Sequence, residues 1–546
     1  MSDSDESDLD DYFPSSSGSE TSEYDTTSDE EDSDCDYSLK DARRWVRLDI
    51  KNLPMPPPRF PFLGQPGIKK NILDASNSLL FFELFFDEQL VLHIVTETNR
   101  FADQYINQHP GKEKSRTKFW HPTNTKEIYI FLGILILQGI TIKPDISLYW
   151  SKNKLIETPI FGKLMSRNRF QLIMKFLHFS DNSTFDENSH PNPKLRKIWP
   201  VFFDLMKKFS SVYTPERDLS IDESLMLFKG KLSWVQYIPL KRARFGVKLF
   251  VLAEAESDYI HNTIIYTGKS TIFDKKYENY GVATKSVMTL IEPFLGKGYC
   301  VIADNFYLSP ELADVLIQHN TDVYGTLRPN RRDLPENFNK ITLKKGEIAA
   351  FQRGKITVLR WRDKKYVSLL SSIHTANCSE TDKKVIKPAI VMNYNLTMGG
   401  VDKADQALVC YPTTRKRQKR YYVTIFRHLL DIAIWNAFIL RKKQLPNIDN
   451  YDFRMNLVER IIEKFHVTAP RSAKRQKLQS DCPLRLTARH FPDLVPSTSS
   501  KKNASRKCIV CSKTKVRRET RYQCNECDVG LCVQPCFRKY HTADKF

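Results

Sequence analysis

An alternation of apolar runs between residues 218 and 327 constrains the fold of this chain more than any other feature. Three strand-like runs come first, then a helix-like run, a strand, a second helix and a last strand. These runs cover 219–228, 246–257, 259–268, 283–294, 298–304, 309–319 and 323–327. Strands that alternate with helices in this way predict a mixed α/β sheet.

Helical patterns flank the predicted sheet on both sides along the chain. An amphipathic segment with a possible serine cap runs from residue 76 to Tyr105. Further helices are predicted at 124–140, 166–179, 200–213, 403–409, 419–441 and 450–465. Residues 346–372 instead have the pattern of a three-stranded meander. Because this meander interrupts the α/β pattern, we interpret it as a β-rich insertion.

The distribution of charge indicates a polyanionic partner. The chain of 546 residues has a formal net charge of +20, but residues 1–39 contain 15 Asp or Glu and no Lys or Arg. The remainder therefore carries +35, and a body this basic favours nucleic acid. A basic protein that contacts ribosomes or acidic proteins is the alternative.

The termini and the cysteines indicate a reducing compartment. Residues 1–40 are Ser, Asp and Glu with little to bury, so we expect disorder, and the proline cluster in 41–74 predicts an extended linker. No secretory signal precedes them, and the apolar run 128–140 is too short to cross a membrane, so no membrane partner is expected. Six of the 11 cysteines fall in 508–536, which favours a metal site over disulfides.

Two predicted strands expose carboxylates. Asp304 ends the buried run in "YCVIADNFYL", and Asp222 follows Leu219 and Ile221 in "DLSIDESL". Neighbouring strands that expose Asp at matching depth can hold Mg²⁺, which prefers carboxylate oxygens. Two such ions about 4 Å apart suit phosphoryl transfer. The alternative is that Asp304 only caps a turn.

A third candidate acid follows a pair of glycines. In "TMGGVDKADQ", Gly399 and Gly400 permit an unusual turn, and Asp402 and Asp405 follow as the chain enters a helix. Their spacing places both acids on one helical face. The alternative is that they stabilise the helix N-terminus, where acids are favoured in any protein.

Three basic runs are candidates for binding the DNA backbone. Lys and Arg bind phosphates without reading bases, and aromatic rings stack on exposed nucleotides. The alternative is a solvated protein surface. The candidates are Lys241, Arg242 and Arg244 in "IPLKRARFGVK", Arg328 in "TLRPNRRDLP", and Arg415, Lys416, Arg417, Lys419, Arg420 and Tyr421 in "TTRKRQKRYY".

The C-terminal cysteines have the spacing of a zinc module. Two C-x2-C pairs, a C-x3-C pair and a histidine provide seven ligands, and two tetrahedral zinc ions need eight. The seven are Cys508, Cys511, Cys524, Cys527, Cys532, Cys536 and His541. The alternating pairs predict a cross-brace, with the first and third pairs on one ion, and Cys482 is one candidate for the eighth ligand. A protein-binding module of PHD or RING type is the competing interpretation.

Basic residues within this module add phosphate-binding charge. They are Lys513, Lys515, Arg517 and Arg518. Upstream, "PRSAKRQKL" at 470–478 has the pattern of a nuclear localisation signal, which predicts a nuclear import receptor as partner and the nucleus as location.

Four motifs together resemble the piggyBac transposase family. They are "SIDESLMLFKGK", "YIPLKRARFGVKLFVLAEAES", "ADNFYLS" and "GGVDKADQ", in the order of the family and at its usual separations. The likeness extends from about residue 75 to the C-terminus. It implies an RNase H-like core whose three aspartates fall on Asp222, Asp304 and Asp402, with Asp405 at a further acidic position.

The resemblance also implies roles for other residues. His490 matches an upstream histidine of related transposases and is the second candidate for the eighth zinc ligand. Tyr421 stands where the family generally has a Trp that stacks on a base, which is a departure from the pattern. In the family, the cysteine-rich tail recognises the transposon ends, often with dimer contacts, so a homodimer is expected.

The implied activity is cut-and-paste transposition of double-stranded DNA. Mg²⁺-activated water nicks each transposon end, the freed 3′-OH forms a hairpin, and the opened ends join a TTAA target. The alternative function is a transposase-derived DNA-binding protein without strand transfer, and a third is a zinc-module chromatin adaptor.

The predicted organisation is an α/β, RNase H-like mixed-sheet core with a β-rich insertion, flanked by a helical DNA-binding and dimerisation domain and a small zinc-binding domain. The boundaries are a disordered N-terminus and linker at 1–74, helical domain at 75–215 and 413–470, catalytic domain at 216–330 and 388–412, insertion at 331–387, basic linker at 471–489 and zinc domain at 490–546.

Overall fold

The computed structural model describes residues 44–109, 116–239, 241, 243–380, 386–415, 418–466, 490–498 and 501–543. The chain divides into two compact units, Met1–His466 and Val467–Phe546. Each unit is described by itself.

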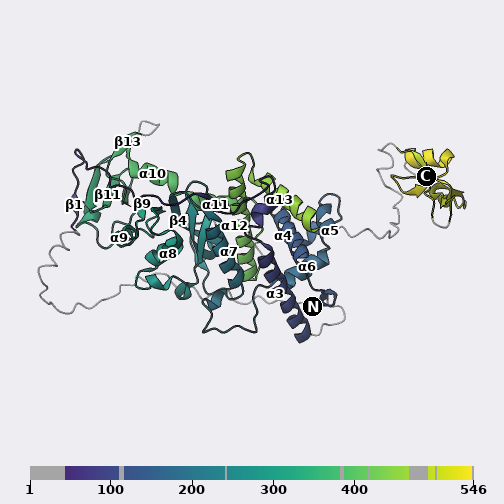
Figure 1. Cartoon of the computed structure of the whole chain (residues 1–546), viewed down its shortest axis with the longest axis horizontal. Helices are drawn as coiled ribbons and strands as arrows, with labels where there is room; N and C mark the ends of the chain where they lie inside the picture. The colour runs from purple at the N-terminus through teal and green to yellow at the C-terminus, as the bar shows by residue number, and fades with distance from the viewer. Residues whose placement is uncertain are drawn as a thin grey trace, which may run out of the picture. The chain divides into compact units, whose positions relative to one another are not determined.

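A ten-stranded sheet forms the centre of the first unit (Figure 1). Its order is β1-β10-β11-β12-β9-β8-β4-β6-β5, and β7 pairs with β6. β8 runs parallel to both β4 and β9, and the other pairs are antiparallel, so the predicted mixed sheet is confirmed. The strands are β1 (Val46–Arg47), β4 (Asp218–Leu227), β5 (Gln236–Tyr237), β6 (Phe245–Glu254), β7 (Ile260–Ile265), β8 (Cys300–Ala303), β9 (Asp322–Thr326), β10 (Ile348–Arg353), β11 (Ile356–Arg362) and β12 (Tyr366–Ser371).

The predicted meander belongs to this same sheet. Its strands β10, β11 and β12 form successive antiparallel pairs, and β12 pairs with β9 through Leu370 and Gly325. The meander therefore extends the sheet edge and does not form a sheet of its own. Two small two-stranded sheets lie apart from it: β2 (Gly67–Ile68) with β3 (Tyr213–Thr214), and β13 (Cys378–Glu380) with β14 (Ile386–Pro388).

The proline-rich segment predicted as a linker is bonded to the body along its described part. Phe60 donates its backbone N–H to the Asp322 carboxylate at 3.0 Å, and the Leu63 N–H donates to the carbonyl of Lys297 at 2.9 Å. Upstream, Val46 of β1 pairs with Gln352 at the sheet edge. The segment is extended, as predicted, but it packs on the sheet.

Helices cover the sheet and form a body beside it (Figure 1). This unit contains most of the predicted helices, within a few residues, and two helices that were not predicted, at 159–164 and 389–397. They are α2 (Ser78–Phe82), α3 (Glu88–Gln108), α4 (Thr125–Ile140), α5 (Pro159–Leu164), α6 (Arg167–Phe176), α7 (Trp199–Val212), α8 (Val282–Ile291), α9 (Pro310–Gln318), α10 (Ala389–Thr397), α11 (Gly400–Cys410), α12 (Tyr421–Gln444) and α13 (Asn450–Phe465).

The long helix predicted from residue 76 to Tyr105 is wrong, because it is two helices. Asn77, and not a serine, caps α2, since its side chain accepts from the N–H of Leu79. Asp87 then caps α3 by accepting from the N–H of Leu90. A second N-cap within the apolar run starts a new helix and turns the chain.

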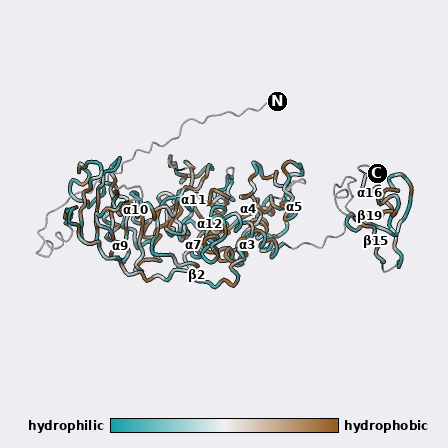
Figure 2. Tube along the Cα trace, turned by 90° about the horizontal axis from the view of Figure 1, so that it is seen from above, coloured by the Kyte–Doolittle hydropathy of each residue, from teal (hydrophilic) through white to brown (hydrophobic). Residues whose placement is uncertain are grey.

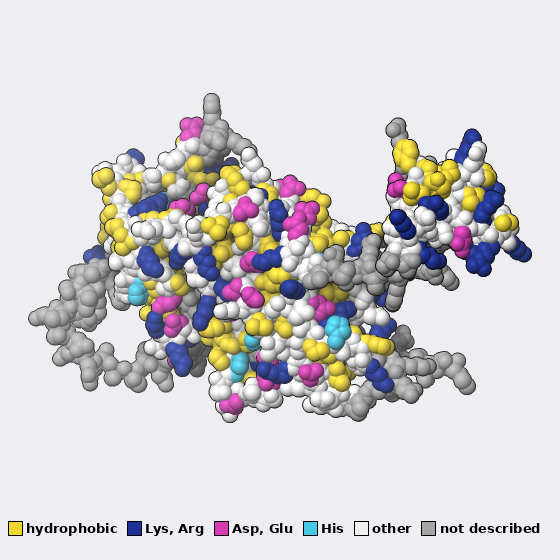
Figure 3. Space-filling model, turned by 45° about the vertical axis from the view of Figure 1, so that its right-hand side comes forward, with side chains coloured by type: hydrophobic (Ala, Val, Ile, Leu, Met, Phe, Trp, Pro, Cys, Tyr) yellow, Lys and Arg dark blue, Asp and Glu magenta, His cyan; other side chains and the backbone are white. Residues whose placement is uncertain are grey.

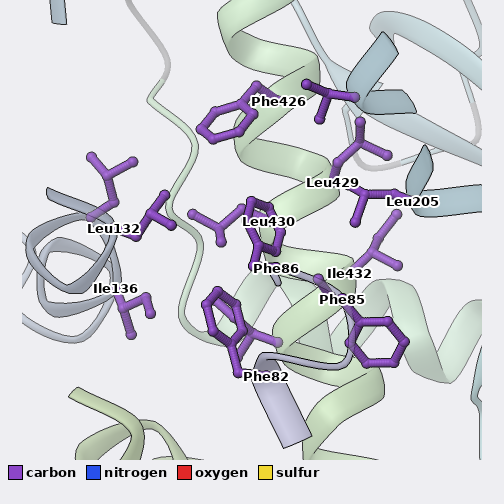
Figure 4. Packing of buried hydrophobic residues seen from close by; sticks show 14 of the residues in the cluster. Phe82, Phe85, Phe86, Leu132, Ile136, Leu205, Phe426, Leu429, Leu430 and Ile432 are labelled. Atoms are coloured by element: carbon purple, nitrogen blue, oxygen red, sulfur yellow. The ribbon is translucent and has the colours of Figure 1, made fainter. Parts of the chain in front are cut away.

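The largest core lies among the helices of the first unit. Figure 4 shows Phe86, from the segment between α2 and α3, close to Phe426 and Leu430 of α12, and the Phe86 and Phe426 rings meet edge to face at 6.1 Å. α12 is long and apolar enough to cross a membrane, but 89% of its most apolar window is buried in the protein. We interpret α12 as the central core helix. In Figure 2, hydrophobic and hydrophilic stretches alternate along the trace of this unit.

The second unit is small and built around cysteines. Its elements are β15 (Pro492–Leu494), β16 (Arg506–Lys507), α15 (Ile509–Lys513), β17 (Glu519–Thr520), β18 (Tyr522–Cys524), β19 (Val529–Gly530) and α16 (Arg538–Thr542). Its buried cluster contains Cys508, Cys524 and Cys536 beside Leu531 and Tyr540. So small an apolar core needs additional links to hold it.

Candidate functional site: carboxylates on the sheet and two Cys/His clusters

The register of two parallel strands brings Asp222 and Asp304 together. β4 and β8 pair from Asp218 opposite Cys300 to Ile221 opposite Ala303. The next residue on each strand is the predicted aspartate, so the two carboxylates leave adjacent strands at the same depth. Both side chains are partly buried, as expected at the end of a core strand.

A glycine allows the third acid to approach the same strand. A Cβ on Gly400 would lie 2.5 Å from Ser220 Oγ and 2.9 Å from the Glu254 carbonyl, so α11 packs against β4 and β6 at a distance that only glycine permits. Asp402 follows in the first turn with its side chain 60% exposed. Asp405, one turn on, is partly buried and accepts a 2.7 Å hydrogen bond from Ser224 of β4.

The electrostatics support a shared site. Burial, with smaller contributions from the negative charges of Asp304 and Asp402, raises the pKa of Asp222 to about 7 against the opposing effect of Lys241. Burial likewise raises the pKa of Asp304, and it raises that of Asp405 to about 6. Carboxyl groups that resist ionisation in this way are stabilised as anions by a bound cation.

The carboxylate oxygens of the aspartates lie farther apart than the ligand atoms of a preformed metal site. Across the part of the chain that the structure describes, only two groups bring three or more potential ligand atoms within 4.8 Å of one another, and both consist of Cys and His. The aspartates therefore share one end of the sheet, while their oxygens remain farther apart than in those clusters.

Four residues that sequence reasoning left out of the site lie beside the aspartates. Glu223 forms an ion pair with Lys248, with 3.2 Å between Glu223 Oε2 and Lys248 Nζ. Arg331 donates to the carbonyls of Asn305 and Phe306, so it fixes the turn that carries Asp304. The buried Tyr307 hydroxyl has no hydrogen-bond partner and lies close enough to Asp222, Glu223 and Asp304 for their charges to raise its pKa. The run "IDES" and the arginines of "RPNRRD" were the available signals.

Three of the predicted DNA-binding residues make hydrogen bonds within the protein. Arg415 donates to the Lys143 carbonyl at 2.9 Å and to the Tyr149 hydroxyl. Arg420 donates to the carbonyls of Lys175 and Met174. Tyr421 is half-buried, and its hydroxyl donates to the Lys194 carbonyl at 2.9 Å. Their side chains are therefore occupied by structural contacts.

Other predicted DNA contacts are more open. Arg244, Arg328 and Lys419 are exposed. Lys241 is partly exposed, with its Nζ 3.5 Å from Asp402 Oδ1. On the face of the first unit drawn in Figure 3, basic side chains lie among acidic and hydrophobic ones and form no single patch. Arg242, Lys416, Arg417, Cys482 and the basic run at 470–478 lie outside the described residues.

One cluster of the second unit joins the first and third cysteine pairs. Cys508, Cys511, Cys532 and Cys536 have sulfurs within 4.8 Å of one another. The Cys511 sulfur lies 3.5 Å from that of Cys536 and 4.0 Å from that of Cys532. A zinc ion with four thiolates has sulfur–sulfur edges of about 3.8 Å. The pairing therefore follows the predicted cross-brace, and the donor set fits zinc.

The second cluster joins Cys524 and Cys527 to two histidines. His490 Nδ1 lies 3.4 Å from the Cys524 sulfur and 3.6 Å from that of Cys527, and His541 Nε2 lies 3.6 Å from Cys527. The other nitrogen of His541 lies 2.9 Å from the Phe537 carbonyl, to which it can donate, and such a bond orients a ligating imidazole. His490 therefore completes a second group of four potential metal ligands, beside Cys524, Cys527 and His541.

The four basic residues predicted to bind phosphate lie close together in this unit. Lys513 ends α15, and Lys515, Arg517 and Arg518 lie between α15 and β17; all four are exposed. Since cysteines of the two Cys/His clusters lie on both sides of this stretch, its four cations are presented on a fixed scaffold.

Known families match both units. The model of the family described as transposase IS4 matches residues 77–438, which is most of the chain. The chain belongs to this transposase family. Within it, the piggyBac resemblance is confirmed by the relatives below. A second model, described as a DDE transposase-like zinc finger, matches residues 489–542 and supports structural zinc at the two clusters.

The relatives are piggyBac-derived. Human PiggyBac transposable element-derived protein 3 is 28% identical over 84% of this chain and 75% of its own length. Human PiggyBac transposable element-derived protein 2 is 24% identical over 81% of this chain and 74% of its own length. The cryo-EM structure of the piggyBac transposase synaptic complex with hairpin DNA matches with a TM-score of 0.66 and 25% identity, over 86% of this chain and 100% of that one.

Proposed function

We propose that this chain is a cut-and-paste DNA transposase with an RNase H-like core whose catalytic residues are Asp222, Asp304 and Asp402. The parallel pairing of β4 with β8 carries this proposal, because it sets the first two carboxylates side by side at the end of core strands. The close packing of Gly400 on β4 supports Asp402 as the third.

The proposed cofactor is a pair of Mg²⁺ ions. Asp222, Asp304 and Asp402 would hold them, with Asp405 as a further ligand. When bound, such ions activate the attacking oxygen and stabilise the leaving one. The raised pKa values of Asp222 and Asp304 support this assignment, because a divalent cation relieves the burial that opposes their ionisation.

The proposed substrate is double-stranded DNA. As the piggyBac resemblance implies, the chain would nick transposon ends, form hairpins and join the ends to TTAA sites. The similar transposase was solved in a synaptic complex with hairpin DNA, which supports the hairpin step. The charge of the body supports a DNA partner. A homodimer, binding of a nuclear import receptor through 470–478 and a nuclear location complete the proposal.

A second function is favoured by two observations. The aspartate oxygens are not gathered within 4.8 Å as the Cys/His ligands are, and the similar human proteins are named as derived from a transposable element. Both observations are consistent with a transposase-derived protein that binds DNA without strand transfer. The chromatin adaptor has no observation in its favour beyond the zinc module itself.

The test uses the full-length protein with a duplex that carries the inverted repeats flanking its coding sequence, in the presence of Mg²⁺. We expect nicking by the wild type and none by Asp304→Asn. Tight binding without nicking would support the DNA-binding protein instead. Absence of any DNA binding would overturn both.

A further inference from the structure

A lysine on the rim of the carboxylate site is fixed by a tight loop. Lys241 lies between β5 and β6, where the Ile238 N–H donates to the Arg244 carbonyl at 2.8 Å. The Lys241 N–H donates to the Ile238 carbonyl at 3.2 Å, and the Arg244 N–H to the Lys241 carbonyl at 3.0 Å. The backbone of Lys241 is therefore hydrogen-bonded to the residues that flank β5 and β6 on either side of it.

The Lys241 ammonium faces acids from both elements of the site. Its Nζ lies 3.5 Å from Asp402 Oδ1 on α11. Burial lowers its pKa, but the charges of Asp222, Asp402 and Asp405 outweigh burial and raise it. The same cation opposes the rise in the pKa values of Asp222 and Asp405. The positive charge of Lys241 therefore interacts with carboxylates on both β4 and α11.

The other cations near the aspartates each contact a partner of their own, although Arg328 is exposed as well. Lys248 pairs with Glu223 and lies 4.5 Å above the Phe306 ring. The Arg328 guanidinium donates to the Asn305 side chain at 3.2 Å, and Arg331 holds the backbone of the same turn. The Lys241 side chain is 25% exposed, against 13% for Lys248, so its ammonium remains accessible to a ligand that arrives from solvent.

Carboxylates outnumber lysines at this site. Asp222, Glu223, Asp304, Asp402 and Asp405 carry five negative charges when ionised, against one positive charge each on Lys241 and Lys248. Removal of Lys241 would make the site more negative at the place where a phosphodiester must approach, and so more repulsive to it.

We propose that Lys241 is a further catalytic residue, whose ammonium contacts a non-bridging oxygen of the phosphodiester that is cleaved. This inference rests on the proposed function. In the nicking step a water oxygen bonds to phosphorus and loses its proton to solvent, while the P–O bond to the 3′ oxygen breaks and that oxygen takes up a proton. Lys241 remains protonated throughout and offsets the negative charge that grows on the phosphoryl oxygens.

The experiment compares Lys241→Met and Lys241→Arg with Lys231→Met, a matched control that removes an exposed lysine between β4 and β5. The first readout is single-turnover nicking of saturating DNA. We expect Lys241→Met to slow nicking by about 10- to 100-fold and Lys241→Arg to restore part of the rate. Lys231→Met should leave the rate unchanged.

The second readout is calorimetric Mn²⁺ binding without DNA. Removal of a cation 3.5 Å from Asp402 should tighten Mn²⁺ binding several-fold in Lys241→Met, whereas Lys241→Arg and Lys231→Met should not change it. Thermal unfolding checks that each variant folds, and Lys241→Gln replaces Lys241→Met if that variant does not.

The outcomes separate the two proposals. Unchanged nicking in Lys241→Met, with nicking lost in Asp304→Asn, would overturn the role of Lys241 and leave the transposase intact. Unchanged Mn²⁺ affinity in Lys241→Met would show that the ammonium does not face the metal-binding carboxylates, and this would overturn the inference as well. No nicking by the wild type would overturn the proposed function, and the catalytic role of Lys241 with it.

Discussion

The two groups of metal-ligand candidates in this protein are assembled in opposite ways. In the second unit, eight Cys and His ligand atoms form two clusters with spacings of a tetrahedron. In the first unit, the aspartates come from β4, β8 and α11, elements held by a sheet and a large apolar core. The second unit has only a few buried apolar residues around its cysteines.

The difference indicates what each metal would do. In the second unit the Cys and His ligands make up most of the core, so a bound metal ion would supply the folding energy. In the first unit the apolar core forms without the aspartates, so these carboxylates can bind an ion reversibly and take part in a reaction. The predictions below test this contrast, and each expects an effect in one unit that the other does not share.

The largest effect is expected from loss of a thiolate ligand. Cys536→Ser, or a zinc chelator, should unfold the second unit, because structural zinc provides on the order of 10 kcal/mol of folding energy. Zinc content by mass spectrometry and limited proteolysis would measure this, with the first unit left intact. Cys378→Ser, at an exposed cysteine of the first unit, is the control. A second unit that stays folded without zinc would remove the contrast.

Asp304→Asn should act on activity without loss of stability. We expect nicking to fall at least about 100-fold, since a metal-ligand charge is lost. Because burial raises the pKa of Asp304, its ionised form opposes folding at neutral pH, and the neutral amide should leave the melting temperature unchanged or slightly higher. Asp103→Asn, at an exposed site on α3, is the control. A large drop in melting temperature would indicate a structural carboxylate.

Gly400→Ala should disturb the third acid through the backbone. The added Cβ would lie 2.5 Å from Ser220 Oγ and 2.9 Å from a carbonyl oxygen, so α11 must shift. Overpacking of this kind costs about 3 kcal/mol at its upper range. We expect a lower free energy of unfolding, measured by chemical denaturation, and a lower rate of nicking. Gly281→Ala, whose added Cβ would meet open space, should change neither. An unaffected variant would show that α11 can move without consequence.

Acid should destabilise the two units for different reasons. In the second unit, protonation of the ligands releases zinc. In the first, burial lowers the pKa of His261 to about 3, and neither ring nitrogen has a hydrogen-bond partner. In the unfolded chain His261 binds a proton near pH 6.5, whereas in the folded protein it stays neutral down to about pH 3. The free energy of unfolding therefore falls as pH drops from 6.5 towards 3, by about 2 kcal/mol at pH 5.

His261→Phe tests this assignment. The ring lies among Tyr213, Tyr259 and Phe294, so an apolar ring of similar size should fit. Melting curves at pH 7.5 and 5 should then show a smaller acid effect than in the wild type. An equal effect would assign the acid sensitivity to the other buried histidines.

The smallest effect is expected on the basic loop of the second unit. Arg517→Ala should weaken DNA binding a few-fold and reduce the slope of log affinity against log salt by about 1, as expected for a single phosphate contact. Binding titrations at several salt concentrations measure it. Arg420→Ala should instead lower stability, because its guanidinium holds backbone carbonyls of the first unit. The reverse result would exchange the roles of the two residues.

The elements that the sequence predicted well are those with strong local patterns. The strands β4 and β6 to β12 and most helices follow the apolar periodicity, and the spacing of the cysteines anticipated the pairing of Cys508 and Cys511 with Cys532 and Cys536. A local pattern could not show that β12 joins β9, because that contact depends on registers far apart in the chain.

The candidate site was predictable only in part for a related reason. Asp222 and Asp304 follow apolar runs, and this signal is visible in the sequence. The structural roles of Arg415, Arg420 and Tyr421 depend on distant carbonyl and hydroxyl groups that a basic run does not reveal. Glu223 also looked like an ordinary strand residue until its pairing with Lys248 placed it beside the aspartates.

The attachment of the proline-rich segment bears on how this protein can be shortened. Asp322 has no exposed surface, and its carboxylate accepts from Lys355, from Ser372 and from the backbone of Phe60. A fragment that started at residue 75, where composition alone would place the cut, would deprive this acid of one donor and open it to water. Fragments meant for crystallisation or expression should therefore begin before Val46, upstream of the first strand.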